Sequence, residues 1–366
     1  MITIAFVIPS SINYNGGIEK TISRYNSFKT QNFRKIVLQG IPAHGTENLY
    51  GIRSVYSKLI IGTSGKMNFV IRLMAPIILK FDRIMNLTII RNIEKNSNII
   101  YLTNDDYYYL FKHNSFFVWS EHGNIPSNYT GVKILNSAIS ALIKNNLMFR
   151  KIKAVHLINC YNSERIPFSK YFCVPNGVDS SRFYPGERKH NTIRLLFVGR
   201  LEKSKGIDKI VNIFRNHNLN MELTVVGSGE LEPLFSSPIK NVNYIKNPDD
   251  NRLGEVYRNS DAFIFPSILE NFGNVVLEAV SSGLYVVASE SLKPRFDGIE
   301  KMNFLEYMDN TEAGILKSLE KIGEKIEYTG KYENKIAIHD YISGKYGWDI
   351  ILRKFYEGIE KVYSEK

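Results

Sequence analysis

Two cations and two carboxylates in the second half of the sequence are candidates for binding and chemistry, and the two cations have a spacing that suits a phosphorylated ligand. Arg200 and Lys205 are five residues apart and directly follow the apolar run 194–199, and Glu270 and Glu278 are eight residues apart. An arginine presents a planar fork of donors and a lysine a mobile point charge, and the two together suit a pyrophosphate. Without such cations a departing nucleoside diphosphate would leave as an unstabilised anion. These residues therefore predict a site for a diphosphate group.

A strand, a helix and a second strand are expected to position the two glutamates. The apolar run 262–265 is typical of a buried strand that empties into a loop, and this loop carries Glu270. The run 274–280 has helical spacing and stops at Gly283, before a second apolar run, 284–288. Such a crossover is right-handed almost without exception, so the loop and the helix N-terminus meet at the carboxyl edge of a parallel sheet, where ligands bind.

The start of this helix is suited to an anion. Its free N–H groups, on Gly273, Asn274 and Val275, would face the ligand, and the helix dipole adds a partial positive charge there. The uncharged pair Phe272 and Gly273 lets a ligand approach the backbone. A loop glutamate and a solvated helix glutamate are the alternative interpretation of the same spacing.

Length and composition indicate a globular α/β protein of two domains. At 366 residues the chain is long for a single core, and its 44% hydrophobic and 23% charged residues are typical of a folded protein. We therefore expect two domains of about 150 to 180 residues each.

The positive charge is confined to the first half of the chain. Residues 1–173 hold 21 Lys and Arg against 8 Asp and Glu, net +13, and the totals of 47 and 36 leave 26 against 28, net −2, for the rest. Such asymmetry suggests an anionic partner for the first half: nucleic acid, an acidic membrane face or a phosphorylated acceptor. We expect no nucleic acid partner, because no reading motif or basic-aromatic platform accompanies the charge.

Cys160 and Cys173 are the two cysteines of the chain. They form no C-x-x-C and no Cys/His cluster at metal spacing, which argues against a structural zinc site and favours a reducing cytosol. We expect both to be core residues. Residues 1–9 carry no basic segment or cleavage site and are typical of a strand, so we expect no signal peptide and a cytoplasmic location.

Two apolar segments of the first half are interrupted by basic residues. In 66–83 the longest uncharged run, 73–79, falls far short of the roughly 20 residues that a transmembrane helix needs, and Pro76 would kink or restart a helix. The segment either lies on a membrane surface with its basic rim against acidic headgroups, or forms a buried helix with solvated basic ends. The second such segment is 138–155.

Two loops of the first half are candidates for the same site. After the first strand, Gly16 and Gly17 remove the Cβ atoms that would block close backbone contact with a phosphate. Beyond the expected strand 116–120, His122 stands beside Glu121 in a position to reach into a cleft. A lone histidine is more often structural, and a glycine pair after a strand is often only a loop.

The sequence around the two glutamates resembles that of family 4 retaining glycosyltransferases, the group 1 glycosyltransferases of bacterial surface polysaccharide type. Residues 266–283 follow the pattern P-S-x-x-E-x-F-G-x-x-x-x-E-A-x-x-x-G, and residues 198–206 follow V-G-R-L-x-x-x-K-G. A G-G-x-E turn at 16–19 and P-N-G-V-D at 175–179 are also similar to the family. The resemblance implies the GT-B fold, in which two Rossmann-like, doubly wound parallel-sheet domains face each other across a deep cleft.

The resemblance also implies roles on the donor side. Glu278 would hold the ribose hydroxyls of a nucleotide, and Glu270 would address the donor sugar. Arg200 and Lys205, rather than Lys203, would neutralise the diphosphate. Backbone atoms would bind the sugar hydroxyls and the distal phosphate at Phe272, Gly273, Asn274 and Val275.

Further contacts are implied for the loops. Lys246 and Asn247 would line the nucleobase pocket, although their side chains do not specify the base. Gly16 and Gly17 would approach the donor diphosphate or sugar, and His122 would be presented to the donor sugar.

The same resemblance divides the chain. Residues 1–171 would bind the acceptor, residues 172–345 would bind the nucleotide sugar, and the C-terminal helix, 346–366, would pack back on the first domain. One segment departs from the family, because residues 289–297 replace the usual loop rich in glycine and proline. The donor-side wall of the pocket is therefore not predicted.

The activity implied is transfer of a sugar, with retained configuration, to a hydroxyl of a lipid-linked or cell-surface glycan precursor. The donor would be a nucleotide-diphosphate sugar, with a UDP-sugar favoured. No D-x-D occurs in the chain, so we expect no metal and no other cofactor. A non-catalytic partner subunit of a transferase and a nucleotide-sugar epimerase are the alternatives. The basic half suggests peripheral association with the inner face of the cell membrane.

Overall fold

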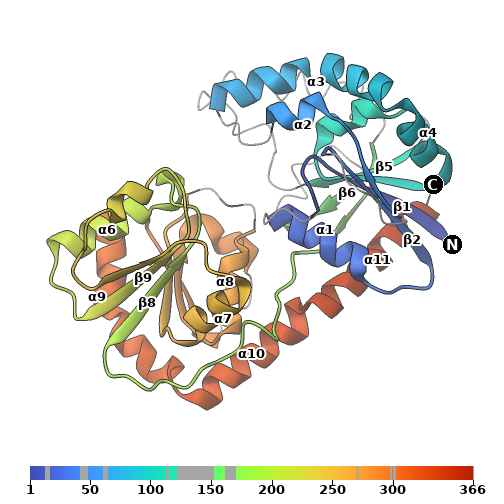
Figure 1. Cartoon of the computed structure of the whole chain (residues 1–366). Helices are drawn as coiled ribbons and strands as arrows, with labels where there is room; N and C mark the ends of the chain where they lie inside the picture. The colour runs from blue at the N-terminus through green and yellow to red at the C-terminus, as the bar shows by residue number, and fades with distance from the viewer. Residues whose placement is uncertain are drawn as a thin grey trace. The chain divides into compact units, whose positions relative to one another are not determined.

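The structure is a computed structural model, and it describes residues 1–366 apart from 13–16, 42–47, 61–64, 113–114, 122–151, 161–169, 269, 271, 297–298, 300–301 and 366. The chain forms two compact units, Met1–Val174 with Leu352–Lys366, and Pro175–Ile351 (Figure 1). The boundaries expected from the sequence, 171/172 and 345/346, are each a few residues earlier in the chain.

A parallel sheet forms the centre of the first unit. Its described strands lie in the order β3-β2-β1-β4-β5-β6-β7, and every neighbouring pair is parallel. The order reverses between β1 and β4, as in a doubly wound sheet. The bounds are β1 Ile2–Ile8, β2 Phe33–Gln39, β3 Leu49–Gly51, β4 Ile99–Leu102, β5 Phe116–Glu121, β6 Ile152–Leu157 and β7 Tyr171–Cys173.

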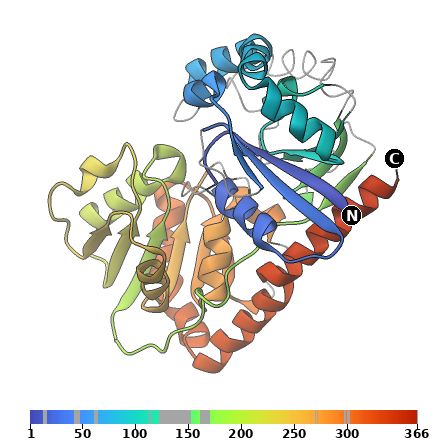
Figure 2. The same ribbon diagram turned by 45° about the vertical axis from the view of Figure 1, so that its right-hand side comes forward.

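Helices cover both faces of this sheet, as the turned view shows (Figure 2). Successive side chains of a strand point to opposite faces. Phe6 of β1 therefore packs with Tyr25 and Phe355 on one face, whereas Ala5 and Val7 join the core on the other. The bounds are α1 Gly17–Ser27, α2 Val55–Ile60, α3 Gly65–Met85, α4 Leu87–Asn96, the 3-10 helix η1 Asp105–Leu110 and the C-terminal α11 Trp348–Ser364.

Aromatic packing holds α11 on the first unit. Phe355 stacks on Tyr25 of α1 with ring centroids 3.8 Å apart, and the hydroxyl of Tyr356 donates to the carbonyl of Tyr25 at 2.6 Å. Ile351, Phe355 and Ile359 of this helix are fully buried.

Helix α3 differs from the buried-helix interpretation of its sequence. It continues through Pro76 as one helix, with Ile71, Ala75 and Leu79 buried and the opposite face exposed. It is therefore neither a fully buried helix nor one ended by the proline. The second apolar segment, 138–155, lies mostly outside the described residues, and its last residues belong to β6.

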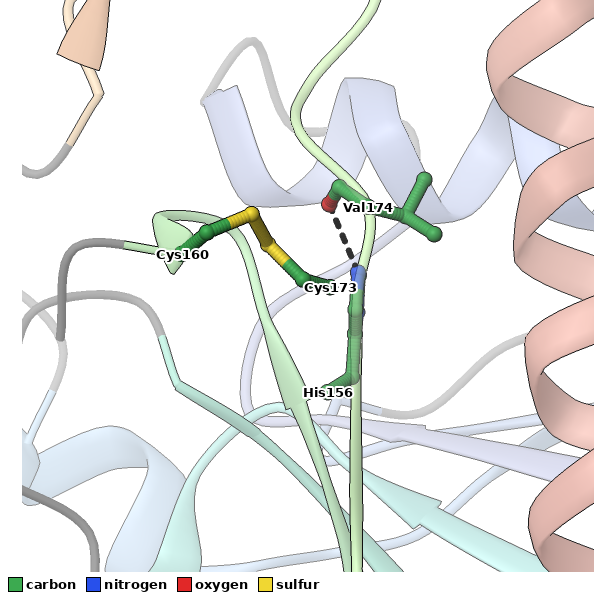
Figure 3. Close-up of a disulfide and its surroundings, with 4 residues drawn as sticks. All are labelled: His156, Cys160, Cys173 and Val174. Atoms are coloured by element: carbon green, nitrogen blue, oxygen red, sulfur yellow. Dashed lines mark hydrogen bonds between the residues drawn. A yellow bond between two sulfur atoms is a disulfide. The ribbon is translucent and has the colours of Figure 1, made fainter. Parts of the chain in front are cut away.

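His156 of β6 contacts Phe355 of α11 and is buried between hydrogen-bond partners. The hydroxyl of Tyr101 lies 2.6 Å from Nδ1, and Nε2 lies 2.8 Å from the carbonyl oxygen of Val174, as Figure 3 shows for the second contact. Burial lowers the pKa of His156 to about 4, so the ring is neutral and its Nε2–H donates to Val174. This bond fixes β6 to Val174, where the chain leaves the first unit.

The expectation that both cysteines are reduced core residues is wrong. Cys160, which is exposed, and Cys173, at the end of β7, are joined by a disulfide (Figure 3). β6 and β7 are neighbouring parallel strands, so the residues directly after β6 lie beside the end of β7. The Cα atoms of Cys160 and Cys173 are therefore only 5.6 Å apart. This separation is within the range that a disulfide needs. A spacing of 13 residues gives no sign of this contact in the sequence.

The second unit repeats the parallel design. Its described strands lie in the order β10-β9-β8-β11-β12-β13, all parallel, with the reversal between β8 and β11. The bounds are β8 Ile193–Val198, β9 Met221–Val226, β10 Val242–Ile245, β11 Ala262–Phe265, β12 Tyr285–Ser289 and β13 Leu305–Met308. The helices are η4 Lys203–Lys205, α6 Ile207–Asn216, η5 Glu232–Phe235, α7 Asp250–Arg258, α8 Asn274–Ser281, η6 Glu290–Arg295, α9 Glu312–Thr329 and α10 Tyr332–Tyr346.

Candidate active site

The candidate site lies at the carboxyl edge of the second sheet, where its strand order reverses. Arg200 and Lys205 follow β8, and Glu270 and the N-terminus of α8 follow β11. Since β8 and β11 are neighbouring parallel strands, both loops leave the sheet at the same edge. Ligands of doubly wound sheets bind at this point.

The loops after β8 and β9 lie against each other at the backbone. A Cβ on Gly227 would stand 1.9 Å from the carbonyl oxygen of Gly199, and one on Gly229 would stand 2.6 Å from that of Leu201. Leu201 also donates its N–H to the carbonyl of Ser228 at 2.9 Å. The glycines after β9 therefore allow a close approach that fixes the loop carrying the two cations.

Lys205 and Glu270 form a buried ion pair. The lysine Nζ donates to Oε1 of Glu270, and the side chains are only 9% and 17% exposed. Nζ also lies 6.0 Å from the centre of the Phe265 ring, within cation–π range. The sequence predicted both residues for one site, and the structure brings their charged groups into contact.

Two serines hold the loops of this pair together. The hydroxyl of Ser267 lies 3.4 Å from Glu270 and 3.4 Å from the carbonyl of Ser204, which also accepts the N–H of Ile268 at 2.9 Å. A β-carbon on Gly206, at φ 72°, would stand 2.9 Å from the carbonyl of Pro266. The turn after η4 thus packs directly on the loop after β11.

The segment that departs from the family pattern supports Glu270. Arg295, in the 3-10 helix η6, donates from Nη2 to the backbone carbonyl of Glu270 at 2.7 Å. Ser291 of the same helix donates to the carbonyl of Ser267 at 3.1 Å. Residues 290–295 therefore hold the Glu270 loop through its backbone, a role that the sequence did not reveal.

The N-terminus of helix α8 has no side-chain cap, so its first N–H groups are suited to an anion. Gly273 is its N-cap, with φ 88° and no side chain to cap the helix, and Asn274 and Val275 form the first turn. Oδ1 of Asn274 accepts from Nδ2 of Asn176 at 3.0 Å. Oδ1 of Asn176 is buried and has no hydrogen-bond partner among the described residues. Phe272 is buried against Phe296 rather than lining an open surface.

Glu278, in the second turn of α8, is oriented by a tyrosine of α7. The hydroxyl of Tyr257 donates to Oε2 of Glu278 at 3.0 Å. Burial, and next the charge of Glu278, raise the pKa of Tyr257 well above its usual value, so the phenol stays protonated and acts as donor.

The other two cations predicted for the site, Arg200 and Lys246, lie at the surface of the second unit. Arg200 is 71% exposed and forms an ion pair with Glu202 at 2.7 Å. Lys246 lies 2.5 Å from Glu232, whose hydrogen bond raises the lysine pKa, and Asn247 has a positive φ of 43°. Arg200 is thus paired with a carboxylate of its own loop, and Lys246 with a carboxylate of the 3-10 helix η5.

The first unit supplies less of the predicted site. Gly17 opens α1, and a Cβ added there would meet no atom within 4 Å. Glu121 is buried at the end of β5, while Gly16 and His122 lie outside the described residues. Where the structure describes the chain, no three His, Cys, Asp or Glu are grouped to hold a metal ion, and metal independence stays a prediction.

The Lys205–Glu270 ion pair lies within a stretch of the chain that matches a protein-family model. Residues 182–297 match the family model described as glycosyl transferases group 1. This stretch contains Arg200, Lys205, Glu270 and Glu278.

Two curated relatives carry the same kind of name. The capsular polysaccharide biosynthesis glycosyltransferase CapM of Staphylococcus aureus is 28% identical over 227 residues, 55% of this chain and 57% of that protein. D-inositol 3-phosphate glycosyltransferase 2 of Catenulispora acidiphila is 29% identical over 164 residues, 37% of this chain and 38% of that protein. The chain thus spans less than two thirds of the length of these relatives.

Similar solved structures confirm the expected GT-B fold class. Sucrose-phosphate synthase from Thermosynechococcus elongatus matches with a TM-score of 0.75 at 12% identity, over all of both chains. The Anabaena protein HepE, in complex with UDP and glucose, matches with a TM-score of 0.66 at 14% identity, over 98% of this chain and 100% of that one.

Several supporting residues were missed by sequence reasoning. Asn176, Tyr257, Ser267 and Arg295 each hold a predicted site residue in place. Asn176 stands in the P-N-G-V-D motif, which did not indicate a contact with Asn274. Tyr257 and Arg295 carry no local signal, because their partners are distant in sequence. Ser267 is part of the P-S-x-x-E pattern, three residues before Glu270, but the pattern did not indicate its contact with the Ser204 loop.

Proposed function

We propose that this chain is a retaining glycosyltransferase that moves a sugar from a UDP-sugar to an acceptor hydroxyl. The observation that carries the proposal is the buried Lys205–Glu270 pair at the switch point of the sheet, inside the stretch that matches the group 1 family. HepE, similar in fold, binds UDP and glucose, which supports this choice of donor.

In the proposed mechanism, the protein positions the donor and stabilises the leaving diphosphate. The donor diphosphate draws the Lys205 ammonium away from Glu270, and Arg200 adds a second cation from the same loop. The released Glu270 carboxylate then accepts a hydrogen bond from the donor sugar. The acceptor hydroxyl attacks from the side of the leaving group, whose phosphate oxygen takes the proton, so the anomeric configuration is retained. The rate acceleration comes from orienting donor and acceptor, and from charged groups that are in position before the reaction begins.

For the acceptor we propose a lipid-linked glycan precursor at a membrane surface. The net charge of +13 on residues 1–173 favours an anionic or membrane-proximal partner. The relative CapM, named for capsular polysaccharide biosynthesis, supports the same class of product.

A thermal-shift panel of UDP-, GDP- and CDP-sugars tests the donor. Binding to the native state alone raises its stability by about 2.7 kcal/mol at a hundredfold excess over Kd. We expect a shift with the UDP-sugars, and no shift with any nucleotide sugar would contradict the proposal.

Replacing Glu278 tests the nucleotide site directly. Glu278→Ala removes the acceptor for the ribose hydroxyls, so UDP binding measured by calorimetry is expected to become undetectable. Tyr257→Phe keeps the carboxylate but removes the hydrogen bond that orients it, and an affinity loss of about fivefold is expected.

The matched control is Tyr285→Phe. Tyr285 also donates to a glutamate, Glu306, but stands at the start of β12, at the opposite edge of the same sheet. Its loss should leave UDP affinity unchanged. Unchanged affinity of Glu278→Ala would show that the site assignment is wrong.

Product analysis separates the reaction from its rivals. We expect NMR of the product to show the donor's anomeric configuration, with turnover unaffected by EDTA. An inverted product, a donor epimerised without acceptor, or activity that vanishes with EDTA and returns with magnesium would each contradict the mechanism.

A further inference from the structure

The outer side of α3 carries a continuous row of exposed apolar side chains. Val70, Met74, Ile77, Phe81 and Ile84 follow each other at alternating intervals of four and three residues, and Ile77 and Ile84 are each 70% exposed. This spacing places all five on one helical face. Scattered exposed apolar residues are normal on a protein surface, whereas a contiguous row marks an interaction surface.

Helix α2, which packs against α3, extends this surface. Its exposed apolar residues are Val55 and Leu59, and Lys58 is exposed between them. We call the exposed residues of α2 and α3 together the α2–α3 face. Figure 2 shows the two helices lying over the same side of the first sheet.

The one carboxylate in this part of the chain is turned inward. Residues 49–93 contain seven Lys and Arg and a single acidic residue, Asp82. Asp82 is buried, where it accepts from the hydroxyl of Ser54 at 2.6 Å and from the N–H groups of Val55 and Tyr56 at 2.8 and 3.1 Å. It therefore caps α2 and contributes no negative charge to the surface.

The basic residues divide by the side of the helix on which they lie. Arg72 and Arg83 are partly buried and paired with Asp106 at 2.9 Å and Glu94 at 2.8 Å. Lys58 and Lys80 are exposed beside the apolar row. Among the described residues of α2 and α3, every exposed charged side chain is therefore positive.

We propose that the α2–α3 face docks the protein on an anionic lipid surface, with the apolar row in the boundary of the acyl chains and the lysines at the headgroups. An apolar stripe rimmed by lysines is the pattern of helices that lie in the interface plane. No helix that the structure describes is long and apolar enough to cross a membrane. A second copy of the chain fits poorly, because two such faces in contact would enclose the lysines of both copies, and neither face has an exposed carboxylate among its described residues to pair with them.

A membrane-docking face suits the proposed function, since a lipid-linked acceptor is reached at the bilayer surface. Vesicle binding needs neither donor nor acceptor, so the docking face and the transferase activity can fail separately.

Co-sedimentation of the full chain with sucrose-loaded vesicles is the test. We expect binding to equimolar phosphatidylcholine and phosphatidylglycerol, weak binding to phosphatidylcholine alone, and a decrease at high salt. The double variant Ile77→Asn, Phe81→Asn should lower the partition coefficient at least about tenfold. The double variant Lys58→Gln, Lys80→Gln should lower it by about fivefold for each charge removed.

Matched controls lie on helices of the second unit. Tyr328 and Tyr332 are exposed to a similar degree, and Lys317 and Lys321 are exposed on α9. Changing the two tyrosines to Asn, or the two lysines to Gln, should leave the partition coefficient within about twofold of the wild type. Circular dichroism melting checks that every variant is folded.

Results of two kinds would overturn the proposal. One is wild-type protein that stays in the supernatant with anionic vesicles, or an apolar double variant that binds them as the wild type does. The other is a wild-type dimer in analytical ultracentrifugation that Ile77→Asn, Phe81→Asn converts to monomer, because the face would then be an interface between copies.

Discussion

The two cations of the candidate site differ most in their surroundings. Lys205 is 9% exposed and bonded to Glu270, whereas Arg200 is 71% exposed and bonded to Glu202. A buried charge left without its partner is costly, while a surface pair is screened by water. The two cations, five positions apart, therefore differ in how tightly the fold couples them to their carboxylates.

A double-mutant cycle on Lys205→Met and Glu270→Gln should show this coupling. We expect an interaction free energy of about 1 to 3 kcal/mol in urea unfolding, because each single variant removes the ion pair and leaves one largely enclosed charge without its opposite charge from this pair. The cycle on Arg200→Met and Glu202→Gln serves as the control and should give at most about 1 kcal/mol. Equal coupling in the two cycles would contradict the distinction.

His156 predicts a pH dependence of stability. Its pKa falls from 6.5 in the unfolded chain to about 4 in the folded one, so below the unfolded value the unfolded state binds more protons. The contribution of this residue is complete above about pH 6.5 and is lost as the pH falls, by about 2 kcal/mol between pH 7 and about pH 5. Histidine ¹⁵N shifts should show a neutral His156 at about pH 5.5, and a protonated ring there would refute the prediction.

At the scale of elements, three loops and one short helix build the candidate site. The loops after β8, β9 and β11 meet because their strands are parallel neighbours, and η6 closes on Glu270 through Arg295. None of these loops is stabilised by regular secondary structure. Their positions depend on glycine contacts and backbone hydrogen bonds between loops.

Gly227→Ala should break one of these contacts. The added Cβ would stand 1.9 Å from the backbone oxygen of Gly199, at a φ of 145° that disfavours alanine. We expect a loss of about 2 to 3 kcal/mol in the free energy of unfolding, together with weaker UDP binding. The control is Gly344→Ala in α10, where no atom lies within 4 Å, and there a gain of about 0.5 to 1 kcal/mol is expected. A neutral effect at Gly227 would show that the loops move apart readily.

At the scale of the whole molecule, the candidate site and the excess positive charge lie in different units. The described candidate site residues other than Gly17 belong to Pro175–Ile351, whereas the excess positive charge and the α2–α3 face belong to the first unit. The disulfide Cys160–Cys173 closes a loop that ends at the last residues before the second unit. It thus constrains the unfolded chain next to the unit boundary.

Removing this disulfide should destabilise the oxidised protein. For a closed loop of 13 residues, chain-entropy arguments give about 3 kcal/mol for Cys160→Ser, Cys173→Ser. Dithiothreitol should lower the wild type to the level of the double variant and leave that variant unchanged. Free thiols in the wild type, seen by mass spectrometry after purification without reductant, would contradict the bond itself.

The sequence by itself determined the fold class and the main chemical groups of the site. Parallel strands followed by glycines and helices have local patterns, and so do V-G-R-L-x-x-x-K-G and the two glutamates around Phe272-Gly273. These signals are local because turn geometry, helix starts and strand burial are set by neighbouring residues.

Only the tertiary structure decided which groups touch. Tyr257 reaches Glu278, Arg295 reaches the Glu270 loop and Cys160 reaches Cys173 because separate elements pack together, and spacing along the chain carries no record of that packing. The same holds for α3, whose apolar residues on opposite sides are alike in sequence. Burial against the sheet distinguishes the core side from the exposed row, since hydrophobicity alone does not say which side finds a neighbour.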